Sequence, residues 1–163
     1  MNHKSSKMKK LTLLATLFIT FAGFAQTTPS NVQLTNPSSV ATPKGYSHAA
    51  VIDLGNCKMI ILSGQVAFDR QGNLVGKDNL EKQTEQVFLN IKSIVEELGG
   101  SMDNVIKLGY FIRDVSQIQA VRNARDQFIN TKNPPASTLV EVSKLFRDDV
   151  LIEIEATAII PKK

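Results

Sequence analysis

The chain has 163 residues, 42% of them hydrophobic, with 19 Lys and Arg, 15 Asp and Glu, and a formal net charge of +4. This length suits one domain that can bury a sizeable core. A single cysteine excludes an internal disulfide, and two histidines leave too few ligands for a zinc, haem or iron–sulfur site, so no cofactor is expected.

The first 25 residues have the pattern of a secretory signal peptide. A cluster of lysines precedes an uncharged apolar run from Leu11 to Phe24, and the small residues Gly23 and Ala25 stand before Gln26. The run is shorter than the ~20 residues that cross a bilayer as a helix, which disfavours the alternative of a retained membrane anchor. We predict a signal peptide at residues 1–25 and an exported protein, periplasmic or secreted.

Loss of this leader would change the charge balance. It removes four of the 19 basic residues and no acidic one, which leaves 15 of each sign and a formally neutral mature chain. The sequence has no stripe of Lys and Arg with interleaved aromatic residues. We therefore expect no nucleic-acid partner, and no membrane partner after cleavage.

The segment that follows the leader is rich in Thr, Ser, Asn and Pro. We expect residues 26–40 to be a flexible N-terminal segment with a short strand near 32–34, and residues 41–163 to form one domain. The domain is expected to begin with a hairpin.

This first hairpin is predicted from two apolar runs around a turn. Residues 45–52 and 58–65 have the composition of strands, and Gly55 and Asn56 mark the turn between them. The stretch 59–62 is apolar on both faces, which is typical of a strand covered on both sides.

Two helices and a strand are predicted next. Asp78 can cap the first helix, with Glu81 completing a capping box, and Gly99 and Gly100 end it. Its apolar stripe repeats at spacings of four and three: Leu80, Thr84, Val87, Ile91, Ile94 and Leu98.

Residues 105–112 predict a third buried strand. Ser116 is then expected to cap a second helix that ends before Pro134. The residues that share one face of this helix are Ile118, Val121, Arg125 and Phe128.

The last thirty residues carry the strongest strand pattern. Residues 150–160 alternate, with Val150, Ile152, Ile154, Ala156 and Ala158 on one side and Leu151, Glu153, Glu155 and Thr157 on the other. With the run 136–142 they predict a closing hairpin. The fold expected is α+β, a mixed sheet with two helices on one face, whose other, apolar face favours oligomerisation.

Several short pieces of the chain also carry a family resemblance, spread over residues 40–160. They are Gly45-Tyr46-Ser47-His48-Ala49, Ser63-Gly64-Gln65, Gly72, Gln83, Val105-Ile106-Lys107, Asp114, Pro135-Ala136 and Glu153-Ile154-Glu155-Ala156. In order and spacing they resemble the reactive-intermediate imine/enamine deaminases, the RidA or YjgF family. The resemblance implies a chorismate-mutase-like homotrimer with three small-molecule clefts between subunits.

The resemblance also implies roles for individual residues. Glu153 would be the catalytic carboxylate that handles the attacking water, and Tyr46 and Ser63 would line the cleft. Active members have, directly after the Pro-Ala pair, an arginine that grips the substrate carboxylate, and this sequence has Ser137 there. The serine hydroxyl offers one neutral hydrogen bond in place of the two charge-assisted hydrogen bonds of an arginine. We therefore expect 2-imino acid hydrolysis to be weak or absent.

Each of these residues has a second interpretation. Glu153 would otherwise be an ordinary polar-face residue like Glu155, and Tyr46 a buried tyrosine with a satisfied hydroxyl. Lys107 or Arg113 would replace the missing charge if either reaches the cleft, although exposed charges at strand ends are commoner. If the protein is an enzyme, the sequence predicts an imine or enamine hydrolase. The alternative is a non-catalytic trimer that binds small ligands or acts like a chaperone.

Overall fold

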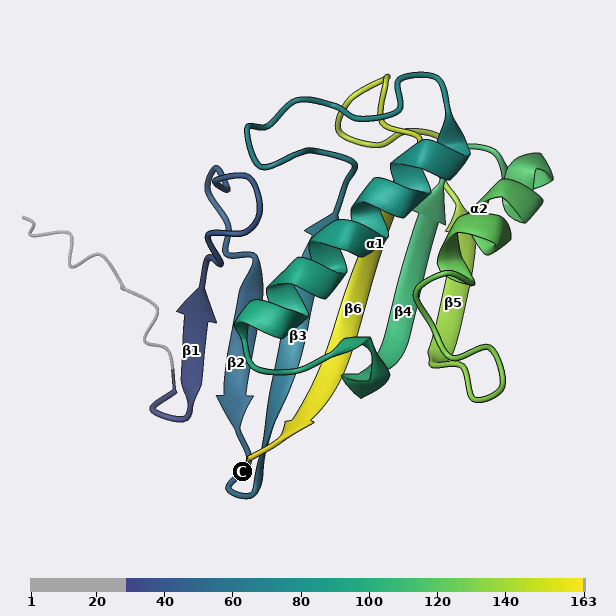
Figure 1. Cartoon of the computed structure of the whole chain (residues 1–163). Helices are drawn as coiled ribbons and strands as arrows, with labels where there is room; N and C mark the ends of the chain where they lie inside the picture. The colour runs from purple at the N-terminus through teal and green to yellow at the C-terminus, as the bar shows by residue number, and fades with distance from the viewer. Residues whose placement is uncertain (1–28, 163) are drawn as a thin grey trace, which may run out of the picture.

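The computed structural model of the chain describes residues 29–162 (Figure 1). The signal peptide predicted at 1–25 lies outside these residues. No helix within the described range is both long and apolar enough to cross a membrane. The elements are β1 (Val32–Thr35), β2 (Ala49–Asp53), β3 (Cys57–Gln65), α1 (Leu80–Glu97), β4 (Val105–Ile112), α2 (Ile118–Arg125), β5 (Ala136–Glu141) and β6 (Ile152–Pro161), with 3-10 turns at Met102–Asn104 and Val115–Gln117.

The strands form one six-stranded mixed sheet in the order β1-β2-β3-β6-β4-β5, and α1 and α2 cover the same face of it (Figure 1). The predicted α+β class is therefore confirmed. The short strand expected near 32–34 is present as β1 and pairs with β2. The first hairpin is present too, although β2 begins at Ala49, four residues later than predicted.

The predicted closing hairpin is wrong, because β5 and β6 are not neighbours in the sheet. After β4 the chain crosses over through α2 and returns as β5, which therefore runs parallel to β4. Strand β6 enters between β3 and β4 and is antiparallel to both. This central position gives the last strand a neighbour on each side.

Both helix starts differ from the prediction by a small shift. Asp78 has a positive φ of 56°, and the side chain of Asn79 instead accepts a hydrogen bond from the Lys82 backbone N–H. Asp114, not Ser116, provides the cap before the second helix: its carboxylate accepts from the Ser116 backbone N–H at 3.0 Å in the 3-10 turn that leads into α2, and α2 itself has no side-chain cap. Asp and Asn side chains cap equally well, so neighbouring candidates are hard to separate by sequence.

The end of α1 is as predicted. Gly99 adopts a φ of 91°, which disfavours any residue with a Cβ. Its N–H donates to the Glu96 carbonyl, and the Gly100 N–H donates to the Val95 carbonyl. This pair of bonds is a Schellman motif, which stops the helix and turns the chain towards β4.

The core lies between α1 and the middle of the sheet. The predicted stripe of α1 is buried except for the half-buried Leu98, and the apolar side of β6 faces it. The opposite face of the sheet carries the other side of β6, and no helix covers it (Figure 1). Large apolar side chains stay exposed on this open face: Leu34, Ile61 and Val140.

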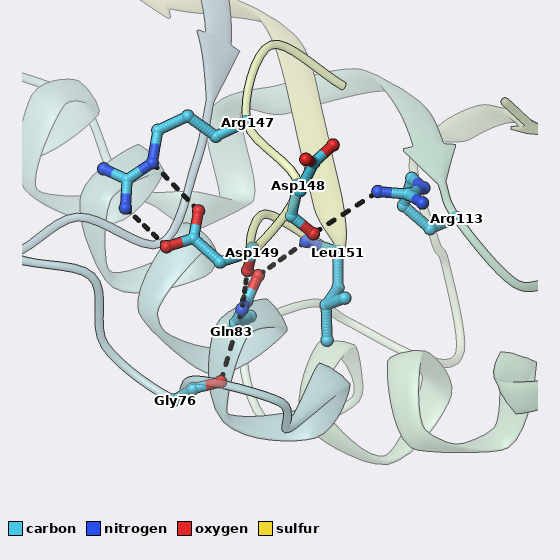
Figure 2. A network of polar contacts seen from close by, with 7 residues as sticks. All are labelled: Gly76, Gln83, Arg113, Arg147, Asp148, Asp149 and Leu151. Atoms are coloured by element: carbon cyan, nitrogen blue, oxygen red, sulfur yellow. Dashed lines mark hydrogen bonds and ion pairs between the residues drawn. The ribbon is translucent and has the colours of Figure 1, made fainter. Parts of the chain in front are cut away.

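Gln83 on α1 fixes the chain just before β6 (Figure 2). Its side chain is fully buried. The amide group donates to the Asp149 carbonyl at 2.8 Å and to the Gly76 carbonyl at 3.3 Å, and its oxygen accepts from the Leu151 N–H at 2.8 Å. One side chain therefore satisfies three backbone groups from two loops and sets where β6 begins.

We expect Gln83→Leu to lower the free energy of unfolding by about 3 kcal/mol, because it leaves buried backbone groups without partners. Urea denaturation at matched protein concentration measures the change. Gln119→Leu is the control: Gln119 is exposed on α2, and its replacement should change stability by less than about 0.5 kcal/mol. Equal effects of the two substitutions would contradict this role for Gln83.

Candidate functional site

A groove of about 910 Å³ opens beside the start of β6. Tyr46, Ser63 and Glu153, all predicted as site residues, line it together. Ser63 is fixed there because its hydroxyl donates to the Ser47 carbonyl at 2.7 Å. Gly64 of β3 also lines the groove, and the remaining walls come from irregular segments: Ala41, Thr42, Lys44, Val66, Phe68, Arg70, Gln71, Gly72, Phe146 and Arg147.

Two glycines give the carboxylates of β6 their space on the open face. Glu153 lies against Gly64 of β3 so closely that a Cβ at that glycine would overlap its carboxylate. Glu155 lies in the same way against Gly109 of β4, where a Cβ would sit 2.6 Å from its Oε1. The β3–β6 register also shifts between Leu62 and Gln65, next to Gly64. The sheet surface is thus shaped around these side chains.

The electrostatics of Glu153 differ from those of an exposed glutamate. Burial raises its pKa, and the neighbouring negative charge of Glu155 raises it further. Burial also raises the pKa of the Tyr46 hydroxyl, and the charge on Glu153 adds to this effect. The two groups are therefore close enough to influence each other. A carboxylate with a raised pKa can accept and return a proton nearer neutral pH.

His48 packs against Tyr46 and does not itself line the groove. It is 4% exposed, and its Nε2 lies 2.7 Å from the Ala41 carbonyl. The ring of Tyr46 meets it edge-on, with 5.3 Å between centroids. Tyr46 itself is 51% exposed. Its ring therefore presents a surface to the groove, unlike the buried tyrosine of the alternative interpretation.

Ser137 and Lys107 lie elsewhere in the single chain. The Lys107 ammonium donates to the Thr138 hydroxyl at 2.6 Å on β5. Ser137 pairs in register with Leu108 and lines a second, smaller cavity beside α2. Arg113 is also outside the groove and donates to the Asp148 carbonyl at 3.4 Å (Figure 2). None of these three lines the groove of Glu153 within one copy of the chain.

Three cations of the groove were not predicted from the sequence: Lys44, Arg70 and Arg147. Arg147 binds both carboxylate oxygens of Asp149 (Figure 2), and its guanidinium lies 5.1 Å from the centroid of the Phe68 ring. These residues sit in irregular segments without periodicity, so no pattern indicated their convergence. Within residues 29–162, no cluster of three His, Cys, Asp or Glu is placed to hold a metal ion.

The comparisons with known proteins identify the family. A family model described as Endoribonuclease L-PSP matches residues 36–160. The chain belongs to this family, which is the RidA/YjgF family. Among curated relatives, this RidA-family chain is 30% identical over 131 residues to a RutC family protein from Synechocystis, covering 80% of this chain and 98% of the relative.

Named enzymes and solved structures also match this RidA-family chain. It is 36% identical over 110 residues to the 2-iminobutanoate/2-iminopropanoate deaminase of Escherichia coli K12, covering 66% of this chain and 83% of that enzyme. The crystal structure of the E. coli YjgF gene product gives a TM-score of 0.66 at 31% identity, with 77% and 97% of the two chains covered. RidA from an Antarctic Psychrobacter gives 0.68 at 29% identity, with 78% and 99% covered.

We expect Glu153→Gln to lower the pKa of Tyr46, because the substitution removes a negative charge that opposes ionisation of the hydroxyl. The chain has two tyrosines, so ultraviolet pH titration resolves them, and Tyr46→Phe assigns the signals. Glu155→Gln is the control and should leave Tyr46 nearly unchanged. An unchanged Tyr46 titration in Glu153→Gln would show that the two groups are not neighbours.

Proposed function

We propose that this protein is an exported RidA-family trimer with small-molecule clefts, related to the 2-imino acid deaminases but with weak or no activity of that kind. The observation that carries the proposal is the juxtaposition of Glu153, its pKa raised by burial, with Tyr46 and Ser63 in one groove. A groove that contains a carboxylate with a raised pKa is typical of a site for acid–base catalysis.

The chemistry of imine hydrolysis fits Glu153. Water adds to the imine carbon, and the resulting carbinolamine releases ammonia to give the keto acid. One group must take a proton from the water and return it to nitrogen. A carboxylate with a raised pKa suits both transfers. Tyr46 would then cover the reacting centre with its ring.

The missing guanidinium argues against strong activity on imino acids. Arginine binds a carboxylate through two parallel charge-assisted hydrogen bonds, whereas Ser137 offers one neutral hydroxyl. The loss is about 1–3 kcal/mol, which corresponds to roughly fivefold to more than a hundredfold in kcat/KM. The groove of Glu153 still contains three cations, Lys44, Arg70 and Arg147, and their positive charge would suit a different acidic ligand.

Assembly is the second part of the proposal. The open face of the sheet carries the exposed apolar residues Leu34, Ile61 and Val140, and exposed apolar surface of this kind favours association. We infer that three copies cover this face. Ser137 of one copy would then approach the groove of the next, which would explain why Ser137 and Glu153 lie apart in a single chain.

Export is the third part. The basic and apolar leader described above supports cleavage after Ala25 and a periplasmic or secreted location. Imines made by cytosolic enzymes would not reach such a protein, so an exported enzyme needs another source of substrate. This point favours the second candidate function, a trimer that binds small ligands, or acts like a chaperone, without turnover.

An imine assay separates these possibilities. An amino-acid oxidase acting on alanine supplies 2-iminopropionate, and its loss is followed with and without the purified protein. We expect the parent protein to accelerate the loss little or not at all. We expect Ser137→Arg to accelerate it by at least about fivefold over the parent, because the substitution restores a guanidinium that can bind the substrate carboxylate through two hydrogen bonds.

Two further variants serve as controls in this assay. Gln119→Arg places the same charge on the exposed surface of α2, outside both cavities, and should not accelerate the reaction. Adding Glu153→Gln to Ser137→Arg should abolish the gain. Rapid turnover by the parent protein would refute the weak-activity proposal. A Ser137→Arg protein that stays inactive would favour the binding alternative.

A further inference from the structure

A second cavity of about 310 Å³ lies between α2, β4 and β5. Its lining has an apolar and a polar part. The apolar part consists of Leu108, Ile129, Pro134 and Pro135, and the polar part consists of Tyr110, Arg125, Asp126, Thr131 and Ser137. It shares no lining residue with the groove of Glu153.

The hydroxyl of Tyr110 is the unusual feature of this cavity. Tyr110 is only 4% exposed, and its hydroxyl has no hydrogen-bond partner among residues 29–162. Buried polar groups in proteins nearly always have a partner, because leaving one unpaired is costly. Burial raises the pKa of Tyr110 to about 12, so the group stays protonated and offers a donor. An acceptor inside the cavity would satisfy it.

Arg125 places a positive charge beside this donor. Its Nε and Nη2 both donate to Oδ1 of Asp126, at 2.8 and 2.7 Å, which fixes one edge of the guanidinium. The charge of Arg125 lowers the pKa of Tyr110 and that of Asp126 raises it, so both groups lie close to the hydroxyl. A guanidinium has five N–H donors, and those not used by Asp126 remain for a ligand.

The lining determines which anion fits best. Arg125 and Asp126 together are neutral, so the cavity has no excess charge for a doubly charged phosphate. A carboxylate carries a single charge and two acceptor oxygens, one for each donor. The apolar wall formed by Leu108 and Ile129 suits a short hydrocarbon chain, which phosphate lacks.

We propose that this cavity binds a short-chain aliphatic carboxylate. The carboxylate accepts from the Tyr110 hydroxyl and the Arg125 guanidinium, and its chain packs against Leu108 and Ile129. Ser137 contributes to the same cavity with a side chain small enough to leave it open. The site does not depend on the proposed chemistry of Glu153, because it requires binding and no turnover.

The test is a titration of the purified full chain with butyrate, followed by NMR or calorimetry. Butanamide is the uncharged analogue of the same shape, and inorganic phosphate is the alternative oxyanion. We expect butyrate to bind with a Kd of about a millimolar, as is usual for so small a ligand. Butanamide and phosphate should bind at least about tenfold more weakly.

Two variants test the donors. Tyr110→Phe removes only the hydroxyl and should weaken butyrate binding at least tenfold, without lowering the thermal midpoint of the ligand-free protein, because that hydroxyl has no partner to lose. Arg125→Gln should weaken binding by a similar factor. Arg122→Gln is the matched control, since Arg122 is exposed on the same helix and does not line the cavity.

The outcomes separate the proposal from its rivals. Butyrate binding that is lost in Tyr110→Phe and Arg125→Gln but kept in Arg122→Gln supports it. Preferential phosphate binding, no binding at all, or binding that survives Tyr110→Phe overturns it. A lower midpoint for Tyr110→Phe also contradicts it, because water would then already satisfy the hydroxyl. Imine hydrolysis is not read in this titration, so failure of the proposed function leaves this result unaffected.

Discussion

The central constraint of this structure is that both helices pack on one face of the sheet while β6 runs through its middle. Every second residue of β6 then enters the core under α1, and the residues between them, including Glu153 and Glu155, face away from the helices. Glu153 is half-buried on this open face, whereas Glu155, two residues further along the same strand, is exposed. The raised pKa of Glu153 therefore depends on its immediate surroundings, which are its burial beside Gly64 and the negative charge of Glu155.

The sheet is also adapted to these carboxylates by residue size. Gly64 and Gly109 stand on the strands at either side of β6, and each leaves the space that one glutamate side chain occupies. Gln83 holds the entry to β6 from the other side of the sheet, through the backbone of Asp149 and Leu151 (Figure 2). Position, space and register of Glu153 thus come from three elements, β3, α1 and β6. The loops that complete the groove add its cations but do not position its carboxylate.

Much of this architecture could be predicted from the sequence, and the failures have physical causes. The apolar stripe of α1 and the alternation of β6 were predictable, because burial of one face gives each helix or strand a regular spacing of apolar residues. That spacing can be seen in the sequence of the single element. The pairing of β6 with β3 and β4 was not, because neighbours in a sheet depend on how the whole chain crosses over. The family resemblance brought Tyr46, Ser63 and Glu153 to attention, and the structure places them in one groove. Arg147 was missed because it lies in an irregular segment, and the cavity beside Tyr110 was missed because it forms only where α2, β4 and β5 meet.

The open face connects the fold to the proposed function, because the account needs further copies of the chain to cover it and to bring Ser137 towards the groove of Glu153. Sedimentation equilibrium of the purified protein at micromolar concentration measures this most directly. The account predicts the mass of three chains. A protein that stays a single chain at that concentration would contradict it, since Ser137 and Glu153 would then belong to separate surfaces.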